Sequence, residues 1–596
     1  MKEGVLNMKW NLKYLFENEE QFNASLNDLN QYPEQLSSYQ GKLKNEKDFV
    51  EYLLLSDKVD EILCRVFQYA HLKSDLNKKD VEAATTFQKV YFFFNRLIQA
   101  TSFESPEILA IGYEKVMEFI DHHPEVNSHR FSMEKLFHMN EHVLDASKEQ
   151  ILSYYSSCSE TGSDLYDALA MADCKAKTIR LSSGQKVLVT QGNWRSLIAD
   201  STSANDRKKI FRAIFDYYEE NKNTFAKIYQ FTYQMDLANV KSRKFDSILQ
   251  SHLFKNNIPT SVYETLVDVA SKENKSLKKY IQLRKKYLHL PSYYSYDRFL
   301  PLAHSDKKYS YEEAQNLFYS SIISCPKDFQ EKAHEVLKEG FVDVYESDGK
   351  RSGAYSSSQP NLHPYILLNY SNTLDDVFTV AHEAGHSIHS LYAQEAQPAN
   401  LQGYTIFVAE IASTFNEHML LDYLMSSSSL THDEKIMLLQ KEIDEITSTF
   451  YRQTLFAHYE LEVSHLIEKE QPINHEVLSN IMIKLYKQYY GMNIQKEKVK
   501  QYVWAYIPHL FHTPFYVYQY ATSFAASFAL YENVKQGKEH AFEKYINLLK
   551  SGGSQYPIDQ TKEAGIDLTS KETFMAVVRR MDELVNELEK MLGAKQ

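Results

Sequence analysis

The stretch that decides the fold is Thr373-Leu-Asp-Asp-Val-Phe-Thr-Val-Ala-His-Glu-Ala-Gly-His386. It opens with chemistry typical of a helix N-terminus, because Thr373 and Asp376 have the spacing of a capping box. Apolar residues then recur at helical spacing to the end of the stretch and beyond it. The stretch therefore predicts an amphipathic helix with His382 and His386 near its middle.

The five residues from His382 to His386 have the H-E-x-x-H spacing. Histidines at positions i and i+4 lie one turn apart on the same helix face, so both imidazoles can bind one Zn²⁺. Glu383, between them, can reach the water that such a metal activates. The alternative is a pair of histidines on a solvated or core-facing helix, and the residues downstream argue against it.

A catalytic zinc usually has three protein ligands, so a third is needed. His389 shares roughly the same helix face, but three imidazoles from one short helix surround a tetrahedral ion poorly. A core or supporting role for His389 is therefore favoured. The metzincin pattern is excluded, because it needs Gly where His389 stands and His where Tyr392 stands. The candidates are His389, Glu395, Glu410 and Glu417.

Glu410 is the best placed of these candidates. It lies in the apolar helical segment 406–412, where an unpaired carboxylate would be costly and metal coordination would explain its presence. A second helix would also approach the ion from another direction. Glu417, two turns further along, could orient a histidine ligand, although a helix-surface charge is an equal alternative.

The length and composition bound the architecture. With 596 residues the chain exceeds one compact core, and the low numbers of Gly (17) and Pro (14) favour long helices. A polar joint at residues 200–205 predicts a domain boundary near residue 195. The division is then into 1–195, an N-terminal helical region, and 196–596, which carries the metal motif. The segment 90–94 predicts a buried stretch of helix.

Charge and cysteine usage exclude several classes of protein. The net charge of −13 argues against nucleic-acid binding and gives no attraction to anionic membranes. The four cysteines are scattered without a C-x-x-C pair, so neither a zinc knuckle nor a disulfide framework is indicated. No apolar signal core and no run of 18 apolar residues is present. These features together predict a protein of the reducing cytoplasm.

Two segments interrupt the helical pattern. Residues 179–190 predict a β-hairpin that turns at Ser183-Gly184. Residues 341–370 alternate and contain turn residues, and 364–370 predicts a strand directly before the metal helix. The free edge of that strand could pair with an extended peptide. An ordinary sheet strand is an equal alternative.

Several segments of the chain resemble segments of a known family. The segments 382–389 and 407–413 resemble the thimet oligopeptidase family of zinc metallopeptidases, above all its bacterial branch, oligoendopeptidase F. The resemblance extends along much of the chain. Further similar segments are 10–16, 353–355, 366–370, 376–382, 508–510 and 514–520.

The resemblance implies roles for residues of the metal motif. The family's zinc ligands fall on His382, His386 and Glu410, with one Zn²⁺ per chain. The general base falls on Glu383. His389 and Glu417 then become supporting residues or alternative ligands.

The resemblance also implies substrate-contacting residues near the C-terminus. His509 matches a histidine that helps to bind substrate, and Tyr520 matches the tyrosine that stabilises the oxyanion. Tyr516 matches a second tyrosine that contacts substrate. Because the spacing is shorter than in the animal enzymes, Tyr516, Tyr518 and Tyr520 stay partly interchangeable. The segment Gly353-Ala354-Tyr355 is expected to bind substrate.

The family fold implies a mainly α protein. It is a two-lobed helical ellipsoid with a deep central channel and a small β-sheet beside the zinc helix. Only short, unfolded peptides would enter that channel, and the chain would cleave their internal bonds. No nucleic-acid or membrane partner is expected.

Two other hypotheses stay open. A different gluzincin, such as an aminopeptidase, would need an acidic site for the substrate's free amine. No Gly-x-Met-Glu-Asn motif of that kind occurs in the sequence. A helical scaffold with an accidental motif would bind no metal.

Overall fold

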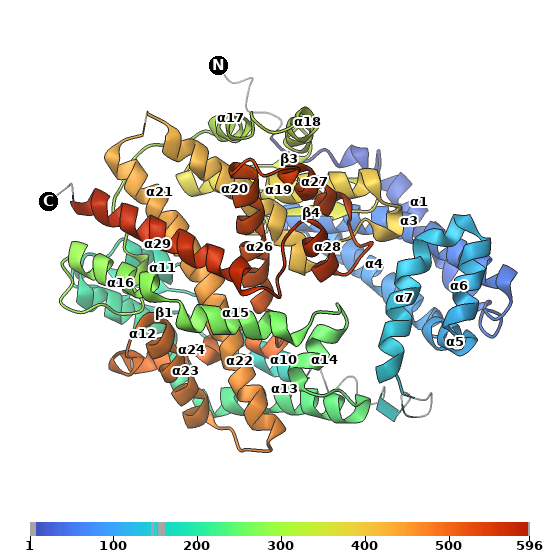
Figure 1. Ribbon diagram of the computed structural model, residues 1–596, viewed down its shortest axis with the longest axis horizontal. Helices are drawn as coiled ribbons and strands as arrows, with labels where there is room; N and C mark the ends of the chain where they lie inside the picture. The colour runs from blue at the N-terminus through green and yellow to red at the C-terminus, as the bar shows by residue number, and fades with distance from the viewer. Residues whose placement is uncertain (1–7, 145–147, 149–150, 153–160, 429, 594–596) are drawn as a thin grey trace. The chain divides into compact units, whose positions relative to one another are not determined.

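The structure is a computed structural model that describes residues 8–144, 148, 151–152, 161–428 and 430–593. The described residues are mainly helical, with one two-stranded and one three-stranded sheet, as the sequence predicts (Figure 1). The chain forms two compact units, each built from three separate segments. The first unit contains 1–141, 306–427 and 530–566, and the second contains 142–305, 428–529 and 567–596.

The predicted boundary near residue 195 separates two parts of the sequence, whereas each of these units combines segments from distant parts of the sequence. Helix α11 (Trp194–Ala199) runs across it, within the second unit. The division into 1–195 and 196–596 remains a prediction about the order of segments along the chain.

The first unit holds N-terminal helices, a small sheet and the helix of the metal motif. Its N-terminal helices are α1 (Glu19–Asp28), α2 (Tyr32–Ser37), α3 (Glu46–Leu76), α4 (Val81–Ala100), α5 (Glu104–Ile111), α6 (Tyr113–His122) and α7 (Arg130–Met139). Its later helices are α17 (Tyr311–Ser321), α18 (Lys327–Val336), α19 (Leu374–Ala396), α20 (Ile406–Ser426), α27 (Ala541–Lys550) and α28 (Pro557–Glu563).

The sheet of the first unit supports the metal-motif helix. Its strands are β3 (Val342–Asp343), β4 (Tyr355–Gln359) and β5 (Leu362–Leu367), in the order β3-β5-β4. Strand β5 pairs in parallel with β3 and antiparallel with β4, and α19 packs against both β4 and β5. The Trp10 indole N–H donates to the Ile366 carbonyl at 2.8 Å, which anchors the N-terminal segment to β5.

The second unit is also helical and contains the predicted hairpin. Strands β1 (Lys177–Arg180) and β2 (Lys186–Val189) pair antiparallel, and Gly184 in the turn has φ +88°. The first helices of the unit are α10 (Thr161–Asp167), α12 (Ala204–Glu220), α13 (Lys222–Arg243), α14 (Ile248–Phe254), α15 (Thr260–Lys272) and α16 (Lys275–Tyr287). The later ones are α21 (His432–Glu445), α22 (Arg452–Glu468), α23 (His475–Tyr490), α24 (Val503–Tyr506), α25 (His509–His512) and α29 (Lys571–Gly593). Helix α26 (Tyr518–Lys535) begins in this unit and ends in the first.

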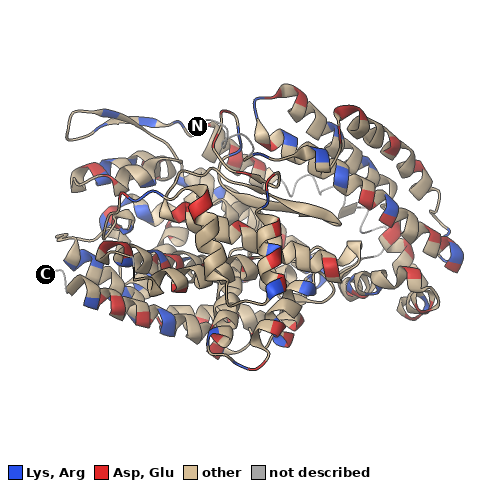
Figure 2. Ribbon diagram, turned by 90° about the horizontal axis from the view of Figure 1, so that it is seen from above, with Lys and Arg blue, Asp and Glu red and all other residues tan. Residues whose placement is uncertain are grey.

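The exposure of side chains corrects one sequence prediction. The prediction that 90–94 is buried is only half right, because Val90 and Phe93 are buried but Tyr91, Phe92 and Phe94 are exposed. The helical period explains this, since consecutive residues point to different faces. Basic residues are interspersed with acidic ones along the helices (Figure 2). Among the described helices, none is both long and apolar enough to cross a membrane.

Candidate functional site

Helix α19 places the two histidines of the motif side by side. The helix begins as predicted, with a capping box in which the Thr373 hydroxyl accepts from the Asp376 N–H and the Asp376 carboxylate accepts from the Thr373 N–H. One turn separates His382 from His386, and their ring centroids are 4.9 Å apart. Both imidazoles therefore point to the same place.

Helix α20 adds a carboxylate to the two imidazoles. Glu410 Oε2 lies 3.5 Å from His382 Nε2 and 3.6 Å from His386 Nε2, and it accepts a hydrogen bond from the Ser413 hydroxyl at 2.9 Å. One ligand atom from each of the three residues lies within 4.8 Å of the other two. Two imidazole nitrogens and one carboxylate oxygen are the protein ligands of one common type of catalytic zinc site.

Gly385 allows α19 and α20 to approach this closely. A Cβ at this position would lie 2.6 Å from the Ala412 carbonyl oxygen and 2.7 Å from the Ser413 Cα, both of which are backbone atoms. Asn416 adds a bond across the same contact by donating to the Ala381 carbonyl at 3.1 Å. The glycine of the motif is thus required by the packing of the two helices that carry the candidate metal ligands.

Glu417 contacts the outer nitrogen of His382. Its carboxylate is hydrogen-bonded to His382 Nδ1, which leaves Nε2 facing the cluster. Burial opposes the charge of the imidazole, but this bond and the nearby carboxylates raise the pKa of His382 to about 10. A carboxylate on the far nitrogen fixes the tautomer and increases the basicity of a metal ligand.

Glu383 is buried, and one of its carboxylate oxygens has no described hydrogen-bond partner. Its side chain is 5% exposed, and burial raises its pKa to about 7. The Ser356 N–H of β4 bonds to its carboxylate. No described residue is a hydrogen-bond partner of Glu383 Oε2. A buried carboxyl with a free oxygen next to a candidate metal site has the environment of a general base.

The other candidate ligands lie outside the cluster. The His389 ring stacks on Tyr404 with centroids 3.6 Å apart, and no described residue bonds to either of its nitrogens. Burial lowers the pKa of His389 to about 3. Glu395 forms an ion pair with Lys332 at 2.8 Å.

The residues expected to contact substrate near the C-terminus form a second cluster, in the second unit. The His509 ring lies 5.9 Å from the Tyr516 ring and 6.2 Å from the Tyr520 ring, and the two tyrosine rings are 5.6 Å apart. Tyr518 is separate from them, because its side chain is 2% exposed and packs on Tyr263. Burial raises the pKa of Tyr518 strongly. Only Tyr516 and Tyr520 therefore stay comparable as donors.

The backbone directly before Tyr516 is held by the buried carboxyl of Glu460, a residue that no sequence motif indicates. Phe515 has φ +57°, an uncommon conformation for a bulky residue. Its N–H donates to Glu460 Oε1 at 2.7 Å, and the Tyr233 hydroxyl donates to the same oxygen at 3.3 Å. Glu460 thereby holds the strained turn directly before Tyr516.

The expected peptide-binding strand requires a correction. Strand β5 has no free edge, because β3 and residues up to Val344 bond to one side of it and β4 bonds to the other. In the described part of the chain no strand pairs with the outer side of β4, so β4 is an edge strand of the sheet. A strand prediction from sequence gives no order of strands, which is why the edge was assigned to the wrong one.

Gly353, Ala354 and Tyr355 lie at the start of this edge strand. Gly353 has φ +85°, and its carbonyl accepts from the Asn369 amide at 2.6 Å. The Tyr355 hydroxyl donates to Asp75 at 2.8 Å, so its side chain is anchored within the unit. What the segment offers for binding is therefore mainly backbone.

Several partners of the site carry no motif that could reveal them. Ser356 and Glu460 act through contacts between distant segments, whereas Ser413 bonds to Glu410 three residues earlier on the same helix. Gly385 and Ser413 stand inside recognisable patterns, Gly385 between the two histidines of the motif and Ser413 at the end of the segment 407–413.

Comparisons with known proteins identify a peptidase family. Residues 197–580 match the model of peptidase family M3, and residues 107–175 match the model of Oligopeptidase F. Oligopeptidase PepF of Bacillus subtilis is 34% identical over 587 residues, which cover 98% of this chain and 87% of that protein. An oligoendopeptidase F homolog of Borreliella burgdorferi is 33% identical, with 95% of each chain covered.

Solved structures match along almost the whole chain. A provisionally assigned peptidase from Chlamydophila abortus matches with a TM-score of 0.88 at 30% identity, covering 98% of both chains. The oligoendopeptidase-F of Enterococcus faecium matches with a TM-score of 0.76 at 26% identity, covering 97% of this chain and 99% of the other.

Proposed function

Because the chain belongs to peptidase family M3, we propose that it is a zinc-dependent endopeptidase that hydrolyses internal bonds of short oligopeptides. The observation that carries the proposal is the convergence of His382, His386 and Glu410 beside the buried carboxyl of Glu383. The names of the relatives, oligopeptidase and oligoendopeptidase F, support the substrate class. We further propose that it acts in the cytoplasm, which fits the free thiols of Cys64, Cys174 and Cys325.

One Zn²⁺ per chain is part of the proposal, held by His382, His386 and Glu410. When bound, zinc lowers the pKa of water and polarises a carbonyl group. Glu417 holds His382 Nδ1, which would leave the Nε2 lone pair available to the ion.

In the proposed mechanism Glu383 moves the proton. It accepts the proton of the attacking water and then delivers it to the leaving amine, a task that needs a carboxyl whose pKa lies near the working pH. The Tyr520 hydroxyl donates a hydrogen bond to the oxyanion that develops on the scissile carbonyl. His509 and Tyr516 are proposed to bind substrate.

The outer side of β4 is proposed to hold the peptide backbone. An extended peptide adds to an edge strand through main-chain hydrogen bonds, which are indifferent to side chains. Ser356 belongs to this strand and also bonds to Glu383, so the strand adjoins the general base. Broad cleavage specificity is expected from such a site.

Cleavage of blocked peptides tests the proposal. A mixture of short peptides, acetylated at the N-terminus and amidated at the C-terminus, is incubated with the zinc-loaded protein, and the products are mapped by mass spectrometry. Internal cuts are expected, while native folded proteins survive. Glu383→Gln is the matched control, because it changes the proton-accepting group but none of the metal ligands.

The Glu383→Gln protein should keep its zinc and lose almost all turnover. Cleavage that requires a free N-terminal amine would indicate an aminopeptidase instead. Absence of bound zinc and of any cleavage after zinc is added would indicate a scaffold with an accidental motif.

A further inference from the structure

A cavity of about 180 Å³ lies entirely within the second unit, and none of the metal-site residues lines it. Helices α16, α21, α22 and α23 contribute its walls, together with the loop around residues 293–299. Part of the wall is apolar, formed by Leu277, Ile281, Phe299 and Met492. An apolar wall with a few polar groups is the kind of lining found in small-molecule sites.

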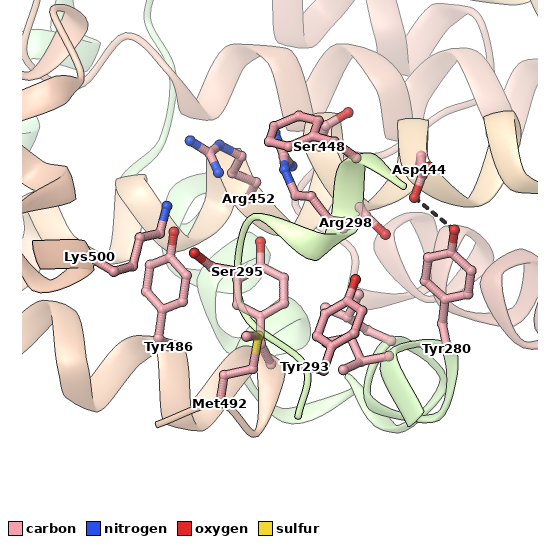
Figure 3. A pocket seen from close by; sticks show the side chains of 15 residues that line it. Tyr280, Tyr293, Ser295, Arg298, Asp444, Ser448, Arg452, Tyr486, Met492 and Lys500 are labelled. Carbon is pink, nitrogen blue, oxygen red and sulfur yellow. Dashed lines mark hydrogen bonds between the residues drawn. The ribbon is translucent and has the colours of Figure 1, made fainter. Parts of the chain in front are cut away.

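Three cationic side chains gather in this cavity (Figure 3). Arg298, Arg452 and Lys500 all line it, although they come from three separate segments of the chain. Figure 3 shows Arg452 and Lys500 on one side and Asp444 on the opposite side. Asp444 already accepts from the Tyr280 hydroxyl at 2.8 Å and from the Gln440 amide at 3.1 Å.

No carboxylate in the described part of the chain forms an ion pair with any of these three cations. Lys500 is only 5% exposed, and its ammonium group lies 5.2 Å from the Phe215 ring centroid. Glu497 is the acid that acts most on Lys500, but its carboxylate also accepts from the Ser295 N–H at 2.8 Å and the Ser295 hydroxyl at 2.5 Å. Buried charges are normally paired, so this cluster is short of negative charge.

The pKa values of the cavity cations also indicate a shortage of negative charge. Burial, followed by repulsion from Arg452, lowers the pKa of Arg298 to about 10. Burial and Arg452 also lower the pKa of Lys500 well below its usual range. An anion placed between the three groups would offset the cost of their desolvation and reduce their mutual repulsion.

The backbone around the cavity is irregular. Residues Ile446–Tyr451 form a π-helix that contributes Thr447 and Ser448 to the wall. Lys498, two residues before Lys500, has φ +57°. π-helical turns and strained residues occur frequently at functional sites, which supports a binding role for this region.

We propose that this cavity binds a small organic phosphate. The phosphate group lies between Arg298, Arg452 and Lys500, and the organic part packs on the apolar wall. A phosphate monoester supplies up to two negative charges and three acceptor oxygens, which match two guanidinium forks and one ammonium group better than a single carboxylate does. The inference does not depend on the proposed peptidase activity.

Calorimetric titration of the zinc-loaded protein with phenyl phosphate, in phosphate-free buffer, tests the proposal. One molecule is expected to bind per chain, at least tenfold more tightly than benzoate, while neutral benzyl alcohol should not bind measurably. Arg452→Met and Lys500→Met should each weaken binding by about tenfold or more, since each removes a charge-assisted hydrogen bond. Arg212→Met is the control, because Arg212 pairs with Asp216 outside the cavity.

Thermal melting of the same variants guards against a folding artefact. In phosphate-free buffer Arg452→Met should melt no lower than the wild type, because it removes repulsion among the three cations. Phenyl phosphate should raise the melting temperature of the wild type more than that of either variant. Equal affinity in the wild type and both cavity variants, or no binding to the wild type, would overturn the proposal. Tighter binding of benzoate would overturn the choice of phosphate.

Discussion

Glu410 and His389 differ in what surrounds their side chains. Glu410 meets both motif histidines, whereas the His389 ring stacks on Tyr404 and has no described hydrogen-bond partner. We expect Glu410→Gln to lose most of its zinc on dialysis, because the variant replaces an anionic ligand by a neutral amide. His389→Gln should keep its zinc and lose thermal stability, because the amide replaces a packed ring. Elemental analysis of the two dialysed proteins gives the ranking, and the reverse order would make His389 the third ligand.

Tyr520 and Tyr516 differ in the role that we assign to their hydroxyls. Tyr520→Phe should lower kcat by about 10²–10³ with little change in KM, because the oxyanion exists only along the reaction path. Tyr516→Phe should act mainly on KM, since its partner is the bound substrate. Steady-state kinetics with one blocked peptide separates the two effects. If Tyr520→Phe leaves kcat unchanged while Tyr516→Phe lowers it strongly, the oxyanion donor is Tyr516 instead.

At the scale of helices, the contact between α19 and α20 positions the proposed metal ligands. Gly385→Ala would force a Cβ against backbone atoms of α20, and overpacking of this kind typically costs about 1–3 kcal/mol. Because the two helices carry different ligands, their separation should also weaken zinc binding. Gly403→Ala is the control, since a Cβ there meets nothing within 4 Å. Denaturant unfolding and zinc titration check both effects, and equal behaviour of the two variants would contradict the packing argument.

The turn before Tyr516 depends on the buried Glu460. Burial raises the pKa of Glu460 to about 8, above its ordinary value near 4.5. The unfolded chain is therefore ionised at this position between about pH 4.5 and 8 while the folded chain is not, so stability falls as the pH rises through this window and then levels off. Glu460→Gln removes the ionisation, and its melting temperature should fall less between pH 5 and 8 than that of the wild type.

A matched control keeps the test specific. Glu331 is exposed and pairs with Lys327, so Glu331→Gln should show the pH dependence of the wild type. Identical slopes for the wild type and Glu460→Gln would mean that Glu460 is ionised throughout this range.

At the scale of the whole molecule, local chemistry was predictable and long-range arrangement was not. The capping box at Thr373, the hairpin around Gly184 and the convergence of His382 with His386 follow from short-range rules. The identity of the third metal-site residue stayed open, because it depends on how two helices pack. The prediction of a free edge on β5 was wrong for the same reason. The two strands that pair with β5 come from other segments, and no local sequence pattern links them to it.

The cation cavity shows the same limit. Arg298, Arg452 and Lys500 are ordinary basic residues when each is seen in its own segment. The fold brings them together around one cavity, where none of them forms an ion pair with a described carboxylate. Composition could not reveal this, because a net charge of −13 averages over the whole surface and interior.

The interleaving of the two units has a consequence for proteolysis. The chain crosses from one unit to the other at 141/142, 305/306, 427/428, 529/530 and 566/567. A single nick between residues 142 and 529 leaves two fragments that each contribute to both units. The fragments are then held together by two hydrophobic cores rather than by a covalent link, so a nicked molecule would keep its native size until it is denatured.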